Sequence, residues 1–350
     1  MTRMIRQSMV AYATPLCETV AEAPEPRGTQ VLVRISCCGL CHSDLHLYDG
    51  YFSLGGDKKL DVTAFRSLPF TLGHEVAGVV EKAGPDADVK PGTSWAVFPW
   101  IGCGECAACK AGEENLCAAP RHLGIQVDGG FATHVLVPHP RYLIDHGSLP
   151  ASLAGAYMCS GLTAFAALKR LTEHAKRGPI LLVGLGGVGM MGLAFALALF
   201  PHKPIVADID PAKRDAALEA GAAAAFDSGD PNARKAVLKA TGGVAGAVDF
   251  AGTDGSLAFA TGSIAKGGKV VITGLIGGSF ATPIAMFPLK AMSIEGTMTG
   301  TLAEAQEMMA LARAGKIPPV PIHERPLSAA QASLDDLRAG KVVGRVVLVP

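Results

Sequence analysis

A glycine-rich motif between two apolar segments constrains the fold of this chain more than any other sequence feature. Residues 184–189 are Gly-Leu-Gly-Gly-Val-Gly, preceded by the strand-like run 179–183 and followed by the apolar, helical segment 190–200. Asp208 ends the next strand-like run, nineteen residues after the last glycine. A Gly-x-Gly-x-x-Gly motif in this context is typical of a dinucleotide-binding Rossmann unit. The alternative is a glycine-rich turn in another kind of α/β protein.

The chemistry of this motif favours NAD as the cofactor. The glycines let the backbone approach a pyrophosphate at the N-terminus of the following helix. Asp208 is placed to accept hydrogen bonds from the adenosine ribose, and its charge would repel the 2′-phosphate of NADP. Strand-like runs at 247–250, 269–274 and 293–296 continue the alternation, so we expect a doubly wound parallel sheet.

The residues before this motif predict a β-rich region with one long loop. Strand-like runs occur at 31–35 and 76–80, and nearby glycines indicate tight turns, as in a small barrel. Residues 48–69 mix glycines, charges and aromatic side chains, and we expect a loop there that holds at most a short helix. Loops of this length are usually functional or mobile. The C-terminal residues predict a helix at 301–315 and a last strand at 344–349.

Four cysteines within fifteen residues predict a structural metal site. Cys103, Cys106, Cys109 and Cys117 follow the spacing Cys-x2-Cys-x2-Cys-x7-Cys. Four thiolates complete a tetrahedral zinc ion and leave no open coordination position, so such a site stabilises a lobe and catalyses nothing. The alternatives are reduced surface thiols, which are prone to oxidation, and an iron–sulfur cluster, which usually follows other spacings.

The densest group of reactive side chains lies at 37–46, Cys-Cys-Gly-Leu-Cys-His-Ser-Asp-Leu-His. Its thiols, imidazoles, hydroxyl and carboxylate favour a catalytic zinc site that begins at Cys41, with Ser43 and His46 carrying protons away from it. Taken alone, His46 could be an ordinary loop histidine. We interpret as inert thiols the three cysteines that match no ligand position, Cys17, Cys37 and Cys38.

Length and charge narrow the class of protein. The 350 residues suffice for two domains, and the 31 basic and 31 acidic residues give no net charge. We therefore expect neither a nucleic-acid partner nor a membrane partner, and the apolar run 190–200 is too short to span a bilayer. The N-terminus lacks the apolar core of a signal peptide and the nine cysteines are an odd number, which favours the cytoplasm and metal binding over disulfides.

Over essentially its whole length the chain resembles the zinc-containing alcohol dehydrogenases of the medium-chain dehydrogenase/reductase superfamily. The resemblance rests on Gly-Leu-Cys-His-Ser-Asp at 39–44, Gly-His-Glu-x-x-Gly at 73–78, the four-cysteine lobe and the glycine motif. It implies an α/β fold in which a GroES-like, β-rich catalytic domain from both ends of the chain holds an inserted Rossmann domain. The implied boundaries are 1–155 with the structural zinc lobe at 100–118, 156–297 for the Rossmann domain, and 298–350 for the return segment.

The resemblance also assigns roles in catalysis to individual side chains. Three protein ligands with a free fourth position characterise a catalytic zinc, and two cysteines with one histidine are a set used for alcohol oxidation. The implied ligands are Cys41, His74 and Cys159. Glu75 lies close enough in the family to enter the coordination sphere transiently, and Asp44 is similar to the carboxylate that orients the histidine ligand. The implied proton relay is Ser43, the nicotinamide ribose and His46.

Further positions match cofactor contacts of the family. His42 corresponds to a pyrophosphate contact, Lys213 to a residue near the adenosine ribose, and Arg345 to a phosphate contact. The remaining implied contacts are Thr163 and Val188 at the nicotinamide, together with Gly184, Gly186, Gly187, Gly189, Asp208, Gly274 and Leu275.

The implied activity is the zinc-dependent oxidation of primary or secondary alcohols to aldehydes or ketones, and the reverse, by hydride transfer to NAD. We expect two zinc ions and NAD in each subunit, a small-molecule substrate, and a homo-oligomer, either dimer or tetramer. The alternatives are a polyol, threonine or formaldehyde dehydrogenase of the same superfamily and a non-catalytic NAD-binding protein. The loop 48–69 is long for the family, and with Trp100 we expect it to border the substrate entrance and favour a bulky or aromatic alcohol.

Overall fold

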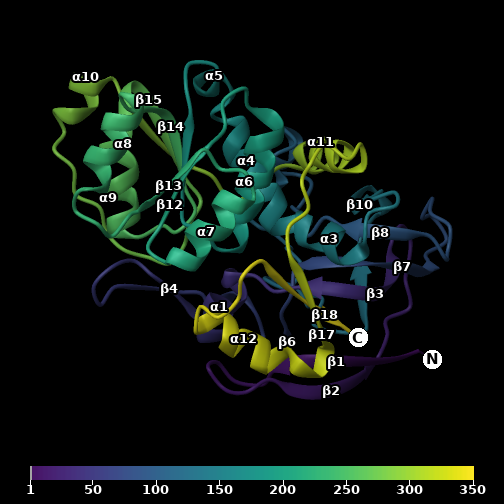
Figure 1. The fold of residues 1–350 in the computed structure, drawn as a ribbon. Coiled ribbons are helices and arrows are strands. Elements are labelled where there is room, and N and C mark those ends of the chain that lie inside the picture. The colour runs from purple at the N-terminus through teal and green to yellow at the C-terminus, as the bar shows by residue number, and fades with distance from the viewer. Residues whose placement is uncertain (1) are drawn as a thin grey trace.

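The computed structural model describes residues 2–350 as two halves, each built around its own β-sheet (Figure 1). A parallel sheet and its helices lie at the upper left of the ribbon, and strands from both ends of the chain lie at the lower right. The two C-terminal strands, β17 (Ile322–Pro326) and β18 (Arg345–Val349), return to the N-terminal half and join its sheet. The middle of the chain is therefore inserted between the two parts of the first half.

The N-terminal half is organised by a seven-stranded sheet with β3 (Val31–Gly39) at its centre. The strands follow the order β10-β8-β7-β3-β18-β17, and β9 also pairs with β3. A β-bulge between Ile35 and Cys37 places Val33 and Cys38 on the same face of β3, where both are fully buried in one hydrophobic cluster. A separate three-stranded sheet has the order β2-β1-β6. The other strands are β1 (Arg3–Met9), β2 (Cys17–Glu22), β6 (Phe70–Thr71), β7 (Glu75–Ala83), β8 (Ser94–Val97), β9 (His134–Val137) and β10 (Leu143–Ile144).

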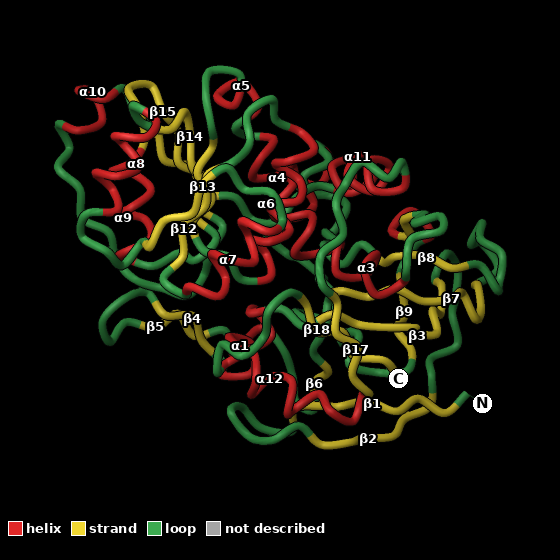
Figure 2. The backbone as a smooth tube through the Cα atoms, in the orientation of Figure 1, coloured by secondary structure: helices red, strands yellow, loops and turns green. Residues whose placement is uncertain are grey.

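The inserted half is a doubly wound parallel sheet, which confirms the predicted fold class. Its six strands pair in parallel in the order β13-β12-β11-β14-β15-β16, the Rossmann order. Helices lie on both sides of these strands (Figure 2). The strands are β11 (Ile180–Val183), β12 (Ile205–Asp208), β13 (Ala224–Asp227), β14 (Val244–Asp249), β15 (Ile264–Ile272) and β16 (Ser293–Gly296), and the helices are α6 (Gly187–Leu199), α7 (Pro211–Glu219), α8 (Ala233–Thr241), α9 (Asp254–Ser263) and α10 (Met286–Lys290).

A continuous helical segment, 151–169, connects the two halves. It consists of α3 (Ala151–Ala156), a π-helical turn at Tyr157–Gly161 and α4 (Leu162–Lys169). Within residues 2–350 this is the one helix long and apolar enough to cross a membrane, but 89% of its apolar window is buried inside the protein. Burial of this extent is typical of a helix in the core of a globular protein.

The region 48–69 is more ordered than the sequence predicts. The expected short helix is present as a 3₁₀ turn at Thr63–Phe65, but the preceding residues form an antiparallel hairpin of β4 (Tyr51–Ser53) and β5 (Lys59–Asp61). The ammonium of Lys59 lies 3.8 Å from the centre of the Tyr51 ring and ties the two strands together. We refer to residues 51–61 as the hairpin.

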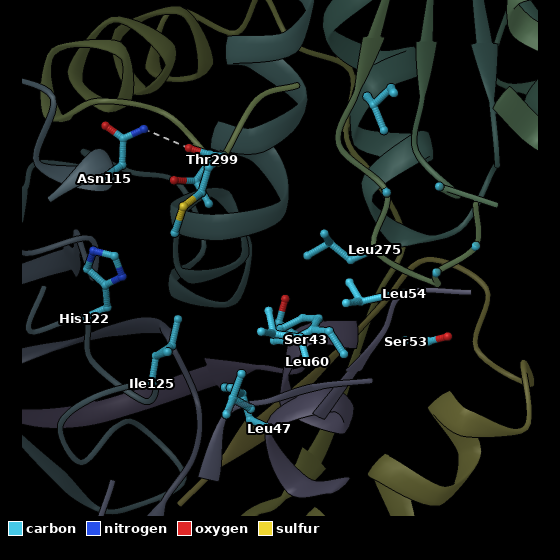
Figure 3. Close-up of a pocket in the computed structure, with 18 of the residues that line it drawn as sticks. Ser43, Leu47, Ser53, Leu54, Leu60, Asn115, His122, Ile125, Leu275 and Thr299 are labelled. Atoms are coloured by element: carbon cyan, nitrogen blue, oxygen red, sulfur yellow. Dashed lines mark hydrogen bonds between the residues drawn. The ribbon is translucent and has the colours of Figure 1, made fainter. Parts of the chain in front are cut away.

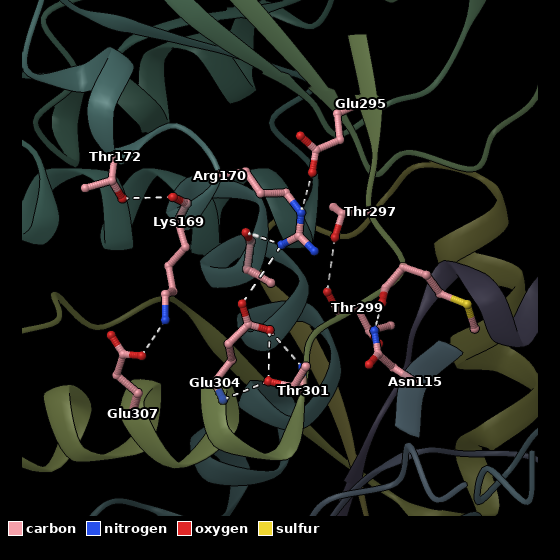
Figure 4. Close-up of polar contacts among 12 residues, drawn as sticks. Asn115, Lys169, Arg170, Thr172, Glu295, Thr297, Thr299, Thr301, Glu304 and Glu307 are labelled. Atoms are coloured by element: carbon pink, nitrogen blue, oxygen red, sulfur yellow. Dashed lines mark hydrogen bonds and ion pairs between the residues drawn. The ribbon is translucent and has the colours of Figure 1, made fainter. Parts of the chain in front are cut away.

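The return segment crosses between the halves through polar contacts (Figure 4). Arg170, after α4, lies 4.0 Å from Glu304 of the return segment and pairs with Glu295 of its own half at 2.9 Å, and Asn115 Nδ2 donates to the carbonyl of Met298 at 2.8 Å. The chain then forms α11 (Leu302–Arg313) and α12 (Ala330–Arg338). On this arrangement we propose the boundaries 1–155, 156–297 and 298–350 as the domain division. The remaining short helices are α2 (Ala107–Lys110) and α5 (Thr172–Ala175).

Candidate active site

Cys41 lies where β3 ends and helix α1 (His42–Asp49) begins. It is the N-cap residue of α1, and its backbone N–H donates to the carboxylate of Asp44 at 2.9 Å. The helix ends at Gly50, which adopts a left-handed conformation. Because a helix N-terminus favours negative charge, this position suits a thiolate. The start of α1 therefore fixes the direction of the Cys41 side chain.

His74 is held close to Cys41 by its neighbours. Gly73 has a φ of +96°, and a Cβ there would lie 2.5 Å from the ring of Phe131, so only glycine fits before this histidine. His74 is fully buried, and its Nδ1 lies 3.3 Å from Oδ1 of Asp44. Asp44 thus contacts both residues and leaves Nε2 of His74 available to a metal ion.

Cys159 completes the group from the π-helical turn. Such turns widen a helix locally and occur frequently at functional sites. The sulfur of Cys159 lies 3.8 Å from that of Cys41, and the ligand atoms of these two cysteines and His74 all lie within 4.8 Å of one another. Two thiolates bound at about 2.3 Å to one tetrahedral ion lie about 3.8 Å apart, so the three side chains fit zinc.

The two thiols of this group titrate as a pair. The hydrogen bond with Cys159 holds the pKa of Cys41 well below its ordinary value, although burial opposes the shift. The same bond, together with burial, raises the pKa of Cys159 well above its ordinary value. The pair therefore retains one proton in a buried site, a proton that a metal cation can replace.

Glu75 is not part of the group of three ligand residues, and its carboxylate is held by other partners. Its Oε1 accepts hydrogen bonds from the backbone and hydroxyl of Ser160, at 3.2 and 2.5 Å, and its Oε2 pairs with Arg345 at 2.5 Å. Arg345 also donates to the carbonyl of Leu40 and lies beside Gly187 of the glycine motif. Arg345 therefore links the metal-binding group to the nucleotide-binding loop.

Ser43 and His46 lie next to the metal-binding group on α1. The Ser43 hydroxyl is 3.7 Å from the sulfur of Cys41. The ring of His46 is tilted by 33° against that of Phe52 in the hairpin, with ring centres 4.7 Å apart, and its Nε2 has no hydrogen-bond partner within residues 2–350. Burial, and next the neighbouring His42, lower the pKa of His46 below 6.5, so the imidazole is neutral at pH 7.

The four-cysteine lobe has the geometry of a second metal site. The ligand atoms of its four cysteines lie within 4.8 Å of one another, and three of the sulfur–sulfur distances are 3.5, 3.8 and 3.9 Å. Backbone N–H groups of Cys103 and Ala119 donate to the sulfur of Cys117 at 3.2 and 3.4 Å. Such bonds stabilise thiolates, and the arrangement fits a tetrahedral structural zinc.

The remaining cysteines behave differently. Burial raises the pKa of Cys37 to about 12 and that of Cys38 well above its ordinary value. Cys17 is exposed. Burial thus keeps Cys37 and Cys38 protonated, as expected for inert thiols.

A cavity of about 560 Å³ extends from the metal-binding group along the carboxyl ends of the parallel strands. This is the crevice in which Rossmann folds bind dinucleotides. Asp208 lines this cavity. Its carboxylate accepts hydrogen bonds from the backbone N–H of Leu185 at 2.6 Å and from that of Asp210 at 2.9 Å. The predicted contacts that line the cavity are His42, Thr163, Gly184, Gly186, Gly187, Val188, Gly189, Asp208, Lys213, Gly274, Leu275 and Arg345.

A second cavity of about 860 Å³ adjoins the first and shares Ser43 and Trp100 with it (Figure 3). The indole of Trp100 lies edge-on to His74, with ring centres 5.6 Å apart. The hairpin forms one wall through Leu54 and Leu60, so the structure places the region 48–69 against this cavity.

Sequence reasoning missed several lining residues of the larger cavity, namely Arg66, Asn115, His122 and Thr299. They come from three separate segments, around 66, 115–122 and 299, that meet only in the folded chain. The position of Asn115 within the four-cysteine lobe, and of His122 just after it, was the one sequence signal available.

Comparison with known proteins matches both halves of the chain. Residues 27–146 match the family described as "Alcohol dehydrogenase GroES-like domain", and residues 187–314 match "Zinc-binding dehydrogenase". The chain is 34% identical over 345 residues to an NAD-dependent alcohol dehydrogenase of Sulfurisphaera tokodaii, covering 98% of this chain and 99% of that relative.

Solved structures of the same fold cover the whole chain. An alcohol dehydrogenase from Aeropyrum pernix superposes with a TM-score of 0.87 at 28% identity, covering 99% of this chain and 100% of that one. A D-arabinose dehydrogenase from Sulfolobus solfataricus superposes with a TM-score of 0.86 at 25% identity and covers 100% of both chains.

Proposed function

The chain belongs to the zinc-dependent alcohol dehydrogenases of the medium-chain dehydrogenase/reductase superfamily, and from this we propose how its residues share the reaction. The enzyme oxidises primary or secondary alcohols to aldehydes or ketones, and catalyses the reverse reduction, with NAD as hydride acceptor. The observation that carries the proposed roles is the junction of the two cavities beside Cys41, His74 and Cys159.

Three residues would hold the catalytic zinc: Cys41, His74 and Cys159. Zinc bound there supplies a Lewis acid that lowers the pKa of the substrate hydroxyl. Asp44 orients His74, and Arg345 with Ser160 keeps the carboxylate of Glu75 close by without placing it among the ligands. The four cysteines of the lobe would hold the structural zinc.

Ser43 and His46 would carry the substrate's proton towards solvent. Ser43 lines both cavities and can accept a hydrogen bond from a hydroxyl group placed beside Cys41. His46, neutral at pH 7, would be the base at the outer end of the route, and the ribose of bound NAD would connect it with Ser43.

Replacing His46 with glutamine removes this base and is expected to lower kcat for alcohol oxidation at pH 7 by about a hundredfold. Wild-type activity should fall as the pH drops through the lowered pKa of His46, because the protonated ring cannot accept a proton, and the variant should lose that part of the pH profile. Steady-state rates between pH 5 and 9 check this. An unchanged profile in His46→Gln would exclude His46 from the relay.

The nucleotide cavity would bind NAD through the glycine loop and Asp208. Asp208 is largely buried, and its carboxylate already orders the loop through Leu185. Lys213, His42 and Arg345 line the same cavity and supply positive or hydrogen-bonding groups for the phosphates and ribose.

Replacing Asp208 with asparagine is expected to lower the ratio of kcat/KM with NAD to that with NADP by about tenfold or more, because a charge-assisted hydrogen bond and a repulsive charge are both lost. The turnover number at saturating NAD should change little, since Asp208 lies away from the metal-binding group. Initial rates with both cofactors measure the ratio. An unchanged ratio would contradict the role of Asp208 in choosing NAD.

The larger cavity indicates the size of the alcohol. About 860 Å³ is far more than ethanol fills, and its hairpin wall is leucine-rich. We therefore propose bulky or aromatic alcohols as preferred substrates, with kcat/KM for benzyl or cyclohexyl alcohols at least about tenfold above that for ethanol. A panel of primary and secondary alcohols tests this and also includes polyols and threonine. Equal efficiency for ethanol and the bulky alcohols would contradict the size proposal.

A homo-oligomer in the cytoplasm completes the proposal. Strand β16 is the outer strand of the parallel sheet, and Ile284 and Leu289 beside α10 are 85% and 67% exposed. An unpaired strand edge that follows a segment with exposed apolar side chains, at Ile284 and in α10 at Leu289, favours pairing with a second copy. Light scattering on the purified protein distinguishes a dimer or tetramer from a monomer.

A further inference from the structure

Polar side chains gather on one side of the larger cavity. In Figure 3 Asn115, His122 and Thr299 lie on the left of the cavity, opposite Leu54 and Leu275 on the right. Each of the three has a buried polar atom without a hydrogen-bond partner in the described part of the chain: Asn115 Oδ1, His122 Nε2 and Thr299 Oγ1. Unpaired buried polar atoms are uncommon and costly, and three in one cavity wall point to a ligand that pairs with them.

The orientation of Asn115 is fixed by its other contact. Its Nδ2 donates to the carbonyl of Met298 at 2.8 Å (Figure 4), which leaves Oδ1 as an acceptor without a donor. Thr299, next to Met298, has a φ of +50°, an unfavourable conformation for a β-branched residue. Strain of this kind is typical of functional sites.

His122 is the most buried polar group of this wall, with 1% of its surface exposed. Its ring packs edge-on against Trp100, 5.3 Å between centres, and Trp100 in turn contacts His74. A single indole therefore separates His122 from the metal-binding group. The backbone of Glu114 is near the ring but not in hydrogen-bonding geometry with Nε2.

Burial lowers the pKa of His122 to about 4, so the ring is neutral at pH 7. A neutral imidazole offers one donor and one acceptor nitrogen. Because the ring carries no charge, it suits a neutral hydroxyl or carbonyl oxygen better than an ionic group.

We propose that the substrate carries a second, neutral oxygen at the end remote from the reacting carbon, and that His122 and Asn115 bind it. The proposal rests on the proposed alcohol dehydrogenase function and names its substrate class: diols, hydroxyketones and related alcohols with an apolar middle. The leucines of the opposite wall cover that middle, and Ser43 lies at the reacting end.

Arg66 supplies the competing possibility of an anionic distal group. It lines the same cavity, is 9% exposed, and its Nη2 has no partner in the described residues. Its Nε and Nη1, however, donate to the carbonyls of Ile125 and Leu47 at 2.9 and 3.4 Å. These bonds tie Arg66 to the backbone of the cavity wall, so the experiment treats a carboxylate substrate as a separate arm.

The test compares α,ω-diols of five to eight carbons with the primary alcohols in which a methyl group replaces the distal hydroxyl. The wild-type enzyme and His122→Phe are assayed with NAD, and the readout is the diol-to-alcohol ratio of kcat/KM in wild type divided by that ratio in the variant. This double ratio cancels the difference in hydration between the substrates. At the best chain length it should be about tenfold or more, through KM rather than kcat, and His122→Asn should restore part of it.

Three outcomes would overturn the inference. A double ratio near one at every chain length would exclude His122 as the partner of a distal oxygen. Turnover of the plain alcohols would still support the proposed dehydrogenase function. A preference for 6-hydroxyhexanoate that survives His122→Phe and disappears in Arg66→Met assigns an anionic group to Arg66 instead. A loss of kcat that is equal for diols and plain alcohols would show that His122 does not bind the distal oxygen. Its role would then be structural, through its packing against Trp100. Failure to oxidise any alcohol would instead contradict the proposed function itself.

Discussion

Cys159→Ala is expected to lower kcat/KM for alcohol oxidation by about a thousandfold or more, while the fold remains intact. The substitution removes one of three ligands and leaves Cys41 and His74, which cannot hold a catalytic zinc firmly. The lost Lewis acid is worth several kcal/mol of barrier, and about 4 kcal/mol corresponds to a thousandfold in rate. The zinc content should fall from two ions to one per chain.

Elemental analysis and NADH formation, measured on the same sample, check this prediction. Cys37→Ala is the matched control, because it also truncates a buried cysteine, lies four residues from Cys41 and belongs to neither metal group. The control should keep both zinc ions and most of the activity. Two zinc ions per chain in Cys159→Ala would contradict the assignment of Cys159 as a ligand of the catalytic zinc.

The complementary change is Cys106→Ser in the four-cysteine lobe. Structural zinc sites contribute strongly to folding, so we expect the unfolding free energy to fall by about 4 kcal/mol or more. Two cysteines of the lobe are partly buried and one is exposed, so little apolar packing remains there without the metal. The variant should lose one zinc, keep the catalytic one, and unfold at a lower temperature.

Thermal unfolding followed by circular dichroism, together with zinc analysis, measures this effect. Cys17→Ser is the control, since Cys17 is an exposed thiol outside the lobe. Because Asn115, Leu116 and Cys117 line the larger cavity, the loss of this zinc should also weaken binding of bulky alcohols. A variant with one zinc and the wild-type unfolding temperature would show that the site has no structural role.

The sequence was most informative where chemistry and local structure depend on neighbouring residues. The glycine motif, the strand before it and Asp208 together predicted the parallel sheet, since each requires the others at fixed spacing. The reactive group at 37–46 predicted Cys41 as a zinc ligand, whereas the roles of His74 and Cys159 came from motif resemblance alone. Their mutual distances depend on long-range packing of β3, β7 and the π-helical turn, which no spacing encodes.

The parts that could not be predicted depend on contacts between distant segments. The hairpin strands have three residues each, too short for a periodic pattern, and are stabilised by their pairing and by Lys59 on Tyr51. Arg345 matched a phosphate contact, but its pairing with Glu75 joins residues 270 positions apart. The polar wall at Asn115, His122 and Thr299 likewise exists only after the return segment packs against the N-terminal part of the chain.

The central claim is that this chain oxidises alcohols with NAD at a zinc site separate from its structural zinc. The most direct test is an alcohol and aldehyde panel, run with NAD and NADP side by side on protein whose zinc content has been measured. The account predicts two zinc ions per chain, NADH formation from bulky alcohols faster than from ethanol, and lower efficiency with NADP. Protein that carries two zinc ions and reduces neither cofactor with any alcohol of the panel would contradict it.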